Sequence, residues 1–353
     1  MFPAESSTTC PPGALMLRRL RFRIASPLVL CTLSAVLSPA FPSFAQDVHV
    51  YVAPDNPPSW TGDKFPTIQM AMDHAPEPGP AGRLYVHIAP SVYRERVVIS
   101  PLRPRTTFLG EGTDPSQVVI TASQNAKSAG GTFFSETVEV LAPDFEADNV
   151  TFENSAGPTG QAVAIAVNAD RAVFKHCRFL GSQDTLFANY GRQYYVNSFI
   201  EGGVDFIFGN ATAFFEQDTI HVIGPGYLTA QSRTSSNQAT GFVFDHAVIT
   251  TNNLDGRPIY LGRPWRGYSR VIFLKSKMPA DISPAGWSPW KKGDIPADTY
   301  YAEWQSEGPG ANPSARVKWS KQLTKEEAAQ FCSMRFLAGD DHWNAAASAA
   351  RLP

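Results

Sequence analysis

The sequence predicts an all-β protein built as a parallel solenoid, on three observations. The chain has 353 residues, of which 43% are hydrophobic and 18% are charged, which is ordinary usage for a globular protein. Short β-rich runs recur between clusters of Gly, Asn, Asp and Pro, with few helical patterns. A pair of apolar residues five positions apart also recurs, at intervals typical of one solenoid coil.

Five segments carry this apolar pair. The pairs are Ala147/Phe152, Phe174/Phe179, Tyr195/Ile200, Phe215/Ile220 and Phe244/Ile249. Successive segments are offset by 27, 21, 20 and 29 residues. A coil of that length would stack its inward side chains on the coils before and after it, and so build a continuous core. The position between the two apolar residues is often small, as in Cys177, Ser198 and Ala247, but Asp218 departs from this trend.

Helical patterns lie at the two ends of the expected solenoid. Near the start, helical spacing of apolar residues predicts a helix that stops before Pro76. Its apolar positions are Ile68, Ala71, Met72 and Ala75. Near the end, Thr324 and Glu327 form a capping box that opens a short helix through Phe331. We expect these helices to cap the terminal coils, and residues 46–353 to form one domain, because no Pro/Gly/Ser linker divides them.

Residues 1–45 are predicted to be a signal peptide. Four Arg residues precede the apolar run Ile24–Leu37, whose 14 residues fall short of the roughly 20 needed to span a bilayer. Ser43-Phe44-Ala45 supplies small residues at a cleavage site, and Met16 is a candidate true start. An uncleaved anchor helix is the alternative. We expect the mature chain to be secreted or periplasmic, with no membrane span.

The charge balance and the number of cysteines exclude several further classes of protein. With 30 basic and 32 acidic residues, the formal net charge of −2 excludes a strongly basic nucleic-acid binder, so no nucleic-acid partner is expected. Two of the four cysteines would leave with the signal peptide. Cys177 and Cys332 remain, too few for a disulfide framework or for a zinc site by themselves. Two separate buried thiols are favoured over one long-range bridge.

The repeat places two aspartates in register. Phe179 lies five residues before Asp184, and Ile200 lies five residues before Asp205. Stacked strands are about 4.8 Å apart, so the two carboxyls would interact and the pKa of one should rise. One proton-bearing carboxyl beside one nucleophilic carboxylate would result. A solvated polar ladder or a cation site is the alternative, but the apolar neighbours of both acids make idle carboxylates costly.

Three segments around these acids resemble the signature segments of the pectin methylesterases, carbohydrate esterases on a right-handed parallel β-helix. They are Gln183–Leu186, Gly203–Gly209 and Leu261–Trp265. Weaker similarity covers Ser91–Glu95, Gly131–Phe133, Gln161–Ile165, Tyr300–Trp304 and Phe336–Gly339. The resemblance runs from about Val48 to Trp343 in the family's order. Ser198 stands where plant members carry a cysteine that pairs with the one matching Cys177, so that bridge cannot form here.

The resemblance implies hydrolysis of the C6 methyl ester of galacturonate in pectin, with release of methanol. Asp205 matches the nucleophile, and Asp184 matches the general acid that later acts as the base. Gln183 matches the amide that stabilises the oxyanion, with Gln161 assisting. Arg263 matches the partner of the nucleophile and is expected to lower the pKa of Asp205. No cofactor and no metal are implied.

The same resemblance implies where the substrate binds. The matching positions are Thr132, Gln161, Phe208, Arg263 and Trp265. Phe187 and Tyr190 are further candidates, because aromatic faces suit the apolar C–H surfaces of sugar rings. The expected partner is methyl-esterified pectin, and the enzyme is expected to act as a monomer.

Three rival functions stay open at this point. A glycosidase on the same architecture would also use two carboxylates, and it would release reducing ends rather than methanol. A non-catalytic polysaccharide-binding solenoid would be expected to have lost the acid pair. A thioesterase acting on acyl-CoA would need a cytosolic substrate, which the export signal argues against.

Overall fold

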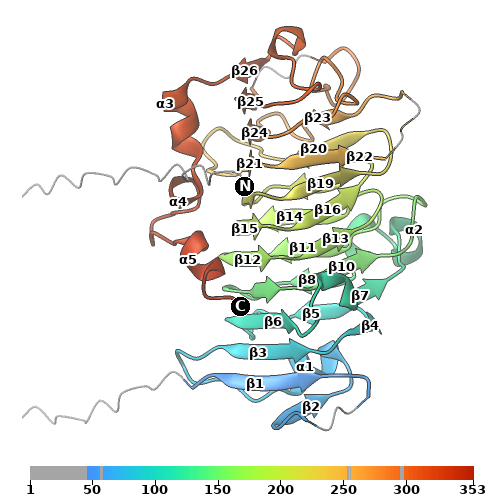
Figure 1. The fold of residues 1–353 in the computed structure, drawn as a ribbon, viewed down its shortest axis with the longest axis vertical. Helices are drawn as coiled ribbons and strands as arrows, with labels where there is room; N and C mark the ends of the chain where they lie inside the picture. Colours follow the sequence, from blue (N-terminus) through green and yellow to red (C-terminus); the bar gives the residue numbers. More distant parts are fainter. Residues whose placement is uncertain (1–45, 56–58, 253, 255, 295–297) are drawn as a thin grey trace, which may run out of the picture.

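The computed structural model describes residues 46–55, 59–252, 254, 256–294 and 298–353. These residues coil into a right-handed parallel β-helix (Figure 1), in which every strand pairing is parallel. The predicted fold class is therefore confirmed. The predicted signal peptide lies outside the described residues.

Three sheets run along the solenoid, each built from one strand of successive coils. Sheet A, in its spatial order, consists of β2 (Asp63–Phe65), β1 (Val48–Val52), β3 (Leu84–Ile88), β6 (Thr106–Gly110), β9 (Glu146–Asp148), β12 (Ala172–Lys175), β15 (Arg192–Val196), β18 (Thr212–Glu216), β21 (Gly241–Asp245), β24 (Arg270–Leu274), β25 (Tyr300–Trp304) and β26 (Ser320–Gln322). Sheet B consists of β22 (Val248–Thr251), β19 (Thr219–Val222), β16 (Phe199–Gly202), β13 (Arg178–Leu180), β10 (Thr151–Asn154), β7 (Val118–Ala122) and β4 (Ser91–Arg94). Sheet C consists of β23 (Tyr260–Gly262), β20 (Tyr227–Gln231), β17 (Ile207–Gly209), β14 (Leu186–Tyr190), β11 (Ile165–Asn168), β8 (Val138–Val140) and β5 (Val97–Ile99).

The helices are short and lie outside the sheets. The α-helices are α1 (Ile68–His74), α2 (Ala126–Ala129), α3 (Lys325–Ala328), α4 (Ser333–Phe336) and α5 (Ala345–Ala349). The 3-10 helices are η1 (Pro115–Gln117), η2 (Thr132–Phe134), η3 (Pro313–Ala315) and η4 (Ala329–Phe331). Both helices expected from the sequence are present, and the predicted capping box between Thr324 and Glu327 forms in full.

The five apolar pairs predicted from the sequence fall into register. The first members lie opposite one another on neighbouring strands of sheet A, as with Phe174 and Tyr195. The second members do the same in sheet B, as with Phe179 and Ile200. Between the two strands each coil turns at a residue with positive φ, such as Asn197 at 51°. That repeated left-handed turn, followed by one inward residue, produces the five-residue spacing.

Stacked rings fill the interior along sheet A. Tyr195 lies 5.0 Å from Phe174 and 4.7 Å from Phe215 between ring centroids, with interplanar angles of 6° and 9°. The stack continues through Phe244 to Phe273, a further coil that the sequence analysis did not detect. Parallel rings at these distances add to the burial of apolar surface, so the stack holds the coils in one register.

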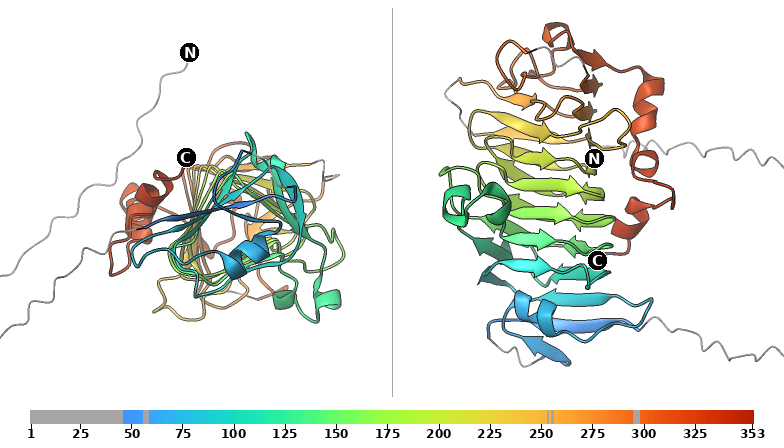
Figure 2. Two further views of the ribbon diagram at one scale, coloured as in Figure 1. Left: turned by 90° about the horizontal axis from the view of Figure 1, so that it is seen from below. Right: turned by 180° about the vertical axis from the view of Figure 1, so that it is seen from behind.

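A helix covers the N-terminal end of the solenoid, whereas the C-terminal helices lie elsewhere. Helix α1 lies across the open N-terminal end, where Ile68, Ala71 and Met72 are buried against the first coils (Figure 2). The prediction of a C-terminal cap was wrong. Helices α3, α4 and α5 run along the side of the solenoid, over the outer face of sheet A (Figure 1). They lie there because the outer face carries an apolar row that needs cover. The row is Val173, Tyr194, Phe214, Val243 and Ile272.

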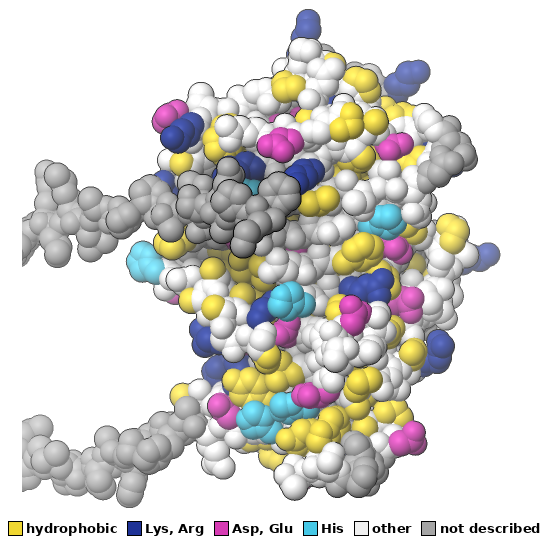
Figure 3. All heavy atoms as spheres, in the orientation of Figure 1, with side chains coloured by type: hydrophobic (Ala, Val, Ile, Leu, Met, Phe, Trp, Pro, Cys, Tyr) yellow, Lys and Arg dark blue, Asp and Glu magenta, His cyan; other side chains and the backbone are white. Residues whose placement is uncertain are grey.

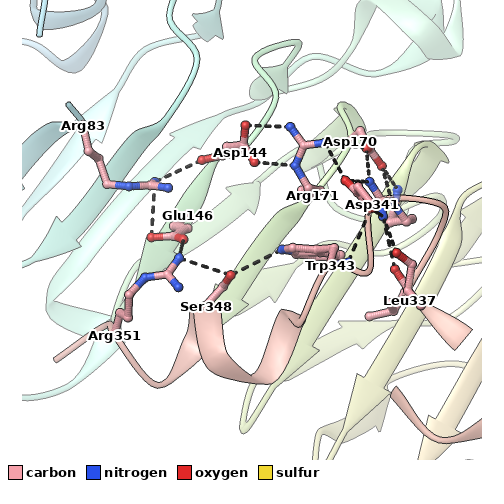
Figure 4. Close-up of polar contacts among 12 residues, drawn as sticks. Arg83, Asp144, Glu146, Asp170, Arg171, Leu337, Asp341, Trp343, Ser348 and Arg351 are labelled. Carbon is pink, nitrogen blue, oxygen red and sulfur yellow. Dashed lines mark hydrogen bonds and ion pairs between the residues drawn. The ribbon is translucent and has the colours of Figure 1, made fainter. Parts of the chain in front are cut away.

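Charged side chains fasten this C-terminal segment to sheet A (Figure 4). Arg192 donates to Asp170 at 2.6 Å and also pairs with Asp341. Arg171 bridges Asp144 and Asp341, with its Nε donating to Asp144 Oδ1 at 2.6 Å. Arg192 also donates to the backbone oxygen of Ala338 at 2.9 Å. The network therefore joins the residue before β12 and the first residue of β15 to Ala338 and Asp341 in the C-terminal segment.

The interior thiol Cys177 is free and buried, so no bridge joins it to Cys332. Its backbone N–H donates to Ser198 Oγ at 3.1 Å, and the backbone N–H of Ser198 donates to Asp218 Oδ1 at 2.7 Å. This last bond gives the anomalous Asp218 a partner inside the core. The expectation of two separate thiols is right for Cys177 and wrong for Cys332, which is half-buried and disulfide-bonded.

The surface carries mixed charge. On the face shown in Figure 3, basic and acidic side chains are interspersed, without a large patch of one sign. Within the part of the chain that the structure describes, no helix is both long and apolar enough to cross a membrane.

We predict that Arg192→Gln lowers the melting temperature by about 4–8 °C. The loss of the half-buried ion pair with Asp170 costs about 2 kcal/mol, between the values for exposed and buried pairs. Each kcal/mol shifts the melting temperature by about 2–4 °C. The hydrogen bond from Arg192 holds the pKa of Asp341 below its usual range. The difference should therefore shrink as the pH falls below about 4, where Asp341 of the unfolded chain begins to bind a proton while Asp341 of the folded protein is still ionised.

The matched control is Arg335→Gln, on the exposed side of α4, where among the described residues the guanidinium donates only to Gln330, at 3.3 Å. Differential scanning fluorimetry across pH gives the comparison. Equal melting temperatures for the two variants would contradict the prediction.

Candidate active site

The two aspartates predicted to be in register occupy equivalent turns on consecutive coils. Asp184 has a φ of 64° and precedes β14, and Asp205 has a φ of 50° and precedes β17. The backbone N–H of Asp184 donates to the oxygen of Val204 on the next coil at 3.1 Å, and the N–H of Asp205 donates to that of Tyr227 at 2.7 Å. Both acids are buried, at 8% and 6% exposure. Strand spacing therefore holds the main chains of the two acids about 4.8 Å apart at the edge of sheet C.

Arg263 grips Asp205 with two hydrogen bonds. Its Nε donates to Oδ1 at 2.9 Å, and its Nη2 donates to Oδ2 at 2.6 Å. The guanidinium is itself enclosed by two aromatic rings, 4.0 Å from the Tyr227 centroid and 4.2 Å from the Trp290 centroid. A cation between two π faces is attracted to both and loses the freedom to rotate. Arg263 is thus a fixed charge, and Asp205 is fixed with it.

The two carboxyls differ in their surroundings. Burial first, and then the charge of Asp205, raises the pKa of Asp184 to about 8. The pKa of Asp205 was expected to be lowered, but burial outweighs the opposing bonds from Arg263 and raises it. Among the described residues, the carboxyl of Asp184 makes no hydrogen bond or ion pair. Because only Asp205 has a bound cation, Asp205 is the member that ionises first, while Asp184 keeps its proton near neutral pH.

Gln161 and Gln183 lie next to each other on consecutive coils, beside this pair. The two residues form an isolated parallel bridge, and Gln183 forms another with Val204, the residue before Asp205. Gln161 is exposed and Gln183 is half-exposed. Neither side-chain amide bonds to any described residue. Two amide donors are therefore free to bind an oxygen next to the carboxyls.

A cleft of about 490 Å³ lies along sheet C next to these residues. Phe187 and Trp265 line it, and exposed Phe133, from η2, stacks on Phe187 with 4.9 Å between centroids. Phe208 is only 3% exposed and supports the floor by stacking on Phe187 at 4.6 Å. The structure thus brings most of the sequence-predicted substrate positions to one place. Thr132 flanks the cleft beside Phe133, whereas Tyr190 is exposed and does not line it.

Several residues of the cleft were not found from the sequence. Tyr227 and Trp290, which enclose Arg263, come from β20 and from a loop far along the chain. For Tyr227 a signal existed, since it lies 22 residues after Asp205 and so falls one coil further in the same row. For Trp290 no sequence spacing could have given the contact. The cleft also holds polar residues that the sequence analysis passed over. They are Glu136, Glu139, Asn168, Asn189, Asn210, Ser232, Thr234 and Arg266.

Within the described residues, no group of three or more His, Cys, Asp or Glu side chains is placed to hold a metal ion. The chemistry available is that of carboxyls, amides and one fixed guanidinium. A solenoid that offers these groups beside a cleft lined by Phe133, Phe187 and Trp265 has the features of a carbohydrate-active hydrolase.

Comparison with known proteins narrows that class. The chain belongs to the pectinesterase family, whose model matches residues 50–340. Members of this family hydrolyse the methyl esters of pectin, and the chain is a carboxylic ester hydrolase of this kind.

Individual relatives agree with this assignment. Pectinesterase 31 of Arabidopsis thaliana is 41% identical over 288 residues, which cover 78% of this chain and 89% of the relative. The solved pectin methylesterase from carrot is 36% identical with a TM-score of 0.78, covering 88% of this chain and 97% of that one. A solved pectin methylesterase in complex with a hexasaccharide is 26% identical with a TM-score of 0.68, over 84% of this chain and 97% of that one.

We predict that Asp184→Asn stabilises the protein at alkaline pH. A carboxyl whose pKa rises from about 3.9 to about 8 on folding binds its proton more tightly in the folded state. Stability is therefore full below about pH 4 and is lost progressively as the pH rises to about 8. The neutral amide removes that loss, so its melting temperature should exceed that of the wild type by several degrees at about pH 8 and match it at about pH 4.

Thermal unfolding of the two proteins across this pH range measures the effect. A variant no more stable than the wild type at the alkaline end would show that Asp184 is not a buried proton-bearing acid.

Proposed function

We propose that Asp205 is the nucleophile and Asp184 the general acid and base in the hydrolysis of galacturonate methyl esters in pectin. The observation that carries this proposal is that the two aspartates occupy equivalent positions on consecutive coils but have different partners. Asp205 is held by Arg263 through two hydrogen bonds. The Asp184 carboxyl has no partner among the residues that the structure describes, and burial and the charge of Asp205 raise its pKa to about 8. A nucleophile must be ionised and a general acid must carry a proton, so each residue suits one role.

In the first half of the reaction, a carboxylate oxygen of Asp205 attacks the ester carbonyl carbon. The carbonyl electron pair moves to its oxygen, and the amides of Gln183 and Gln161 donate to that oxyanion. The carbonyl then reforms, the bond to the methoxy group breaks, and Asp184 gives its proton to the leaving oxygen. Methanol departs, and the galacturonyl group remains bound to Asp205 as an anhydride.

In the second half, Asp184 is a carboxylate and acts as a base. It removes a proton from water, and the resulting hydroxide attacks the acyl carbon. The same two amides stabilise the second oxyanion. The bond to Asp205 then breaks, galacturonic acid is released and gives its proton to solvent, and both aspartates return to their starting states.

The cleft supports a polysaccharide as the substrate. Trp265, Phe187 and Phe133 present ring surface along sheet C. Phe187 and Phe208 lie opposite each other on the two strands that follow the aspartates, so this surface begins next to the carboxyls. A relative 26% identical over 84% of this chain carries a hexasaccharide in its solved structure. We assign Trp265, Phe208, Thr132 and Gln161 to substrate binding on this basis, with Phe208 as support for the floor.

The N-terminal pattern of Arg residues, the apolar run Ile24–Leu37 and the small residues before Gln46 support export of the enzyme. We place its action outside the cytoplasm, in the periplasm or the medium, where methyl-esterified pectin is available. We further propose that it acts as a monomer, because the candidate site is complete within one chain.

Asp205→Ala tests the assignment of the nucleophile. Loss of the covalent step should lower methanol release from highly methylated pectin by at least about a thousandfold, with the fold intact. Reducing ends should be assayed in parallel, since the rival glycosidase would release them and an esterase would not. Asp218→Ala is unsuitable as a control because Asp218 is buried in the core, so Asp298→Ala, on the exposed surface, serves instead. Retention of more than about a tenth of wild-type turnover would reject the assignment.

Arg263→Lys tests whether Arg263 acts by positioning Asp205 or only by its positive charge. Lysine keeps a positive charge but loses the planar fork that makes two bonds to Asp205 and fits between Tyr227 and Trp290. We expect kcat to fall by at least about tenfold with a modest change in KM, the pattern of an interaction that matters in the transition state. A normal kcat with a greatly raised KM would instead make Arg263 a clamp for a substrate carboxylate.

A further inference from the structure

The floor of the cleft is a single row of outward-facing positions, one on each coil. Strand pairing places Glu139 opposite Ala166, Ala166 opposite Phe187, Phe187 opposite Phe208 and Phe208 opposite Ala230. A polysaccharide lying along the solenoid crosses these coils in turn. Glu139 is two coils, about 10 Å, before Phe187, whose coil also carries Asp184. It therefore faces a neighbouring sugar rather than the sugar whose ester reacts.

One end of the cleft is acidic. Glu136, three residues before Glu139, is buried and pairs with Arg96 at 2.5 Å. Glu139 is half-exposed, and its Oε1 accepts from the Asn168 amide at 3.3 Å. None of the ion pairs among the described residues includes Glu139. Its negative charge thus reaches the cleft without a counter-ion.

The other end of the cleft is basic. The guanidinium of Arg266 is exposed, lies 4.6 Å from the Trp265 ring centroid and donates to the backbone oxygen of Trp265 at 3.0 Å. No acid among the described residues pairs with it. Arg266 and Glu139 line the same cavity. Glu139 is on β8, whereas the N–H of Trp265, next to Arg266, donates to Gln231 on β20, four strands further along sheet C. The cleft therefore has an electrostatic direction along the solenoid axis.

We propose that this polarity makes the enzyme select the methylation pattern around the reacting sugar. A free galacturonate carries a negative charge, and a methyl-esterified galacturonate carries none. The subsite at Glu139 repels the charged sugar and accepts the ester, whereas the subsite at Arg266 attracts the free carboxylate. The inference rests on pectin as the substrate, as proposed above, and adds which sugar the enzyme prefers on each side of the ester that it hydrolyses.

The test compares two pectins with the same backbone, one highly methylated and one randomly demethylated to about half by alkali. The quantity measured is kcat/KM for methanol release at low ionic strength, with a chelator present to remove pectin-bound calcium. We expect Glu139→Gln to raise the ratio of half-methylated to highly methylated activity by roughly three- to tenfold, the effect of removing one repulsive charge pair. Arg266→Gln should lower the same ratio by a similar factor, and salt should shrink both shifts.

The control is Glu326→Gln, an exposed change of the same kind on α3, on the far side of sheet A. It should leave the ratio unchanged. Melting temperatures check that each variant is folded. An unmoved ratio in Glu139→Gln, or shifts of the same sign in both cleft variants, would overturn the proposal while leaving the esterase function in place. Absence of methanol release by the wild-type enzyme from either pectin would instead remove the proposed function itself.

Discussion

In-register stacking of one coil on the next, at the spacing of hydrogen-bonded parallel strands, positions every side chain of the core and of the candidate site. Phe174, Tyr195 and Phe215 stack because their strands pair with no shift. Asp184 and Asp205 lie side by side for the same reason. A slip of one residue would send the apolar row outward and separate the acids, so the packing of the core and the geometry of the site are enforced together.

The same stacking explains how two carboxyls can be held next to each other in a buried position that disfavours the charged form of both. An isolated pair of buried carboxyls would protonate or move apart, but the backbone bonds of Asp184 and Asp205 to the next coil fix both main chains. Arg263 compensates only Asp205, and Tyr227 and Trp290 prevent Arg263 from turning away to compensate both. The asymmetry between the acids is thus a property of the surrounding coils and loops, because their own coil positions are equivalent.

Periodic features of the fold could be predicted from the sequence, whereas features that depend on insertions or distant loops could not. The five-residue pairs predicted the coils from Ala147 to Ile249, because each turn between sheet A and sheet B has the same length there. Phe108 and Ile120 belong to the same rows but are 12 residues apart, since η1 lengthens that turn. The C-terminal helices were placed on the wrong surface, because their sequence gives the helices but not the apolar row they cover. Within the site, the register of the aspartates followed from the repeat. The contact of Trp290 with Arg263 and the net pKa direction of Asp205 required the folded chain.

The C-terminal segment sets the order in which the fold can be completed. Its ion pairs join Arg171 to Asp341, 170 residues further along the chain, and its apolar side chains pack on an outer row contributed by several coils. Each coil needs only its neighbours in order to stack, but this segment has no surface to dock on until β12, β15 and β18 already lie side by side. Docking is therefore a late event in folding, and the outer row around Tyr194 and Phe214 stays uncovered until this segment docks.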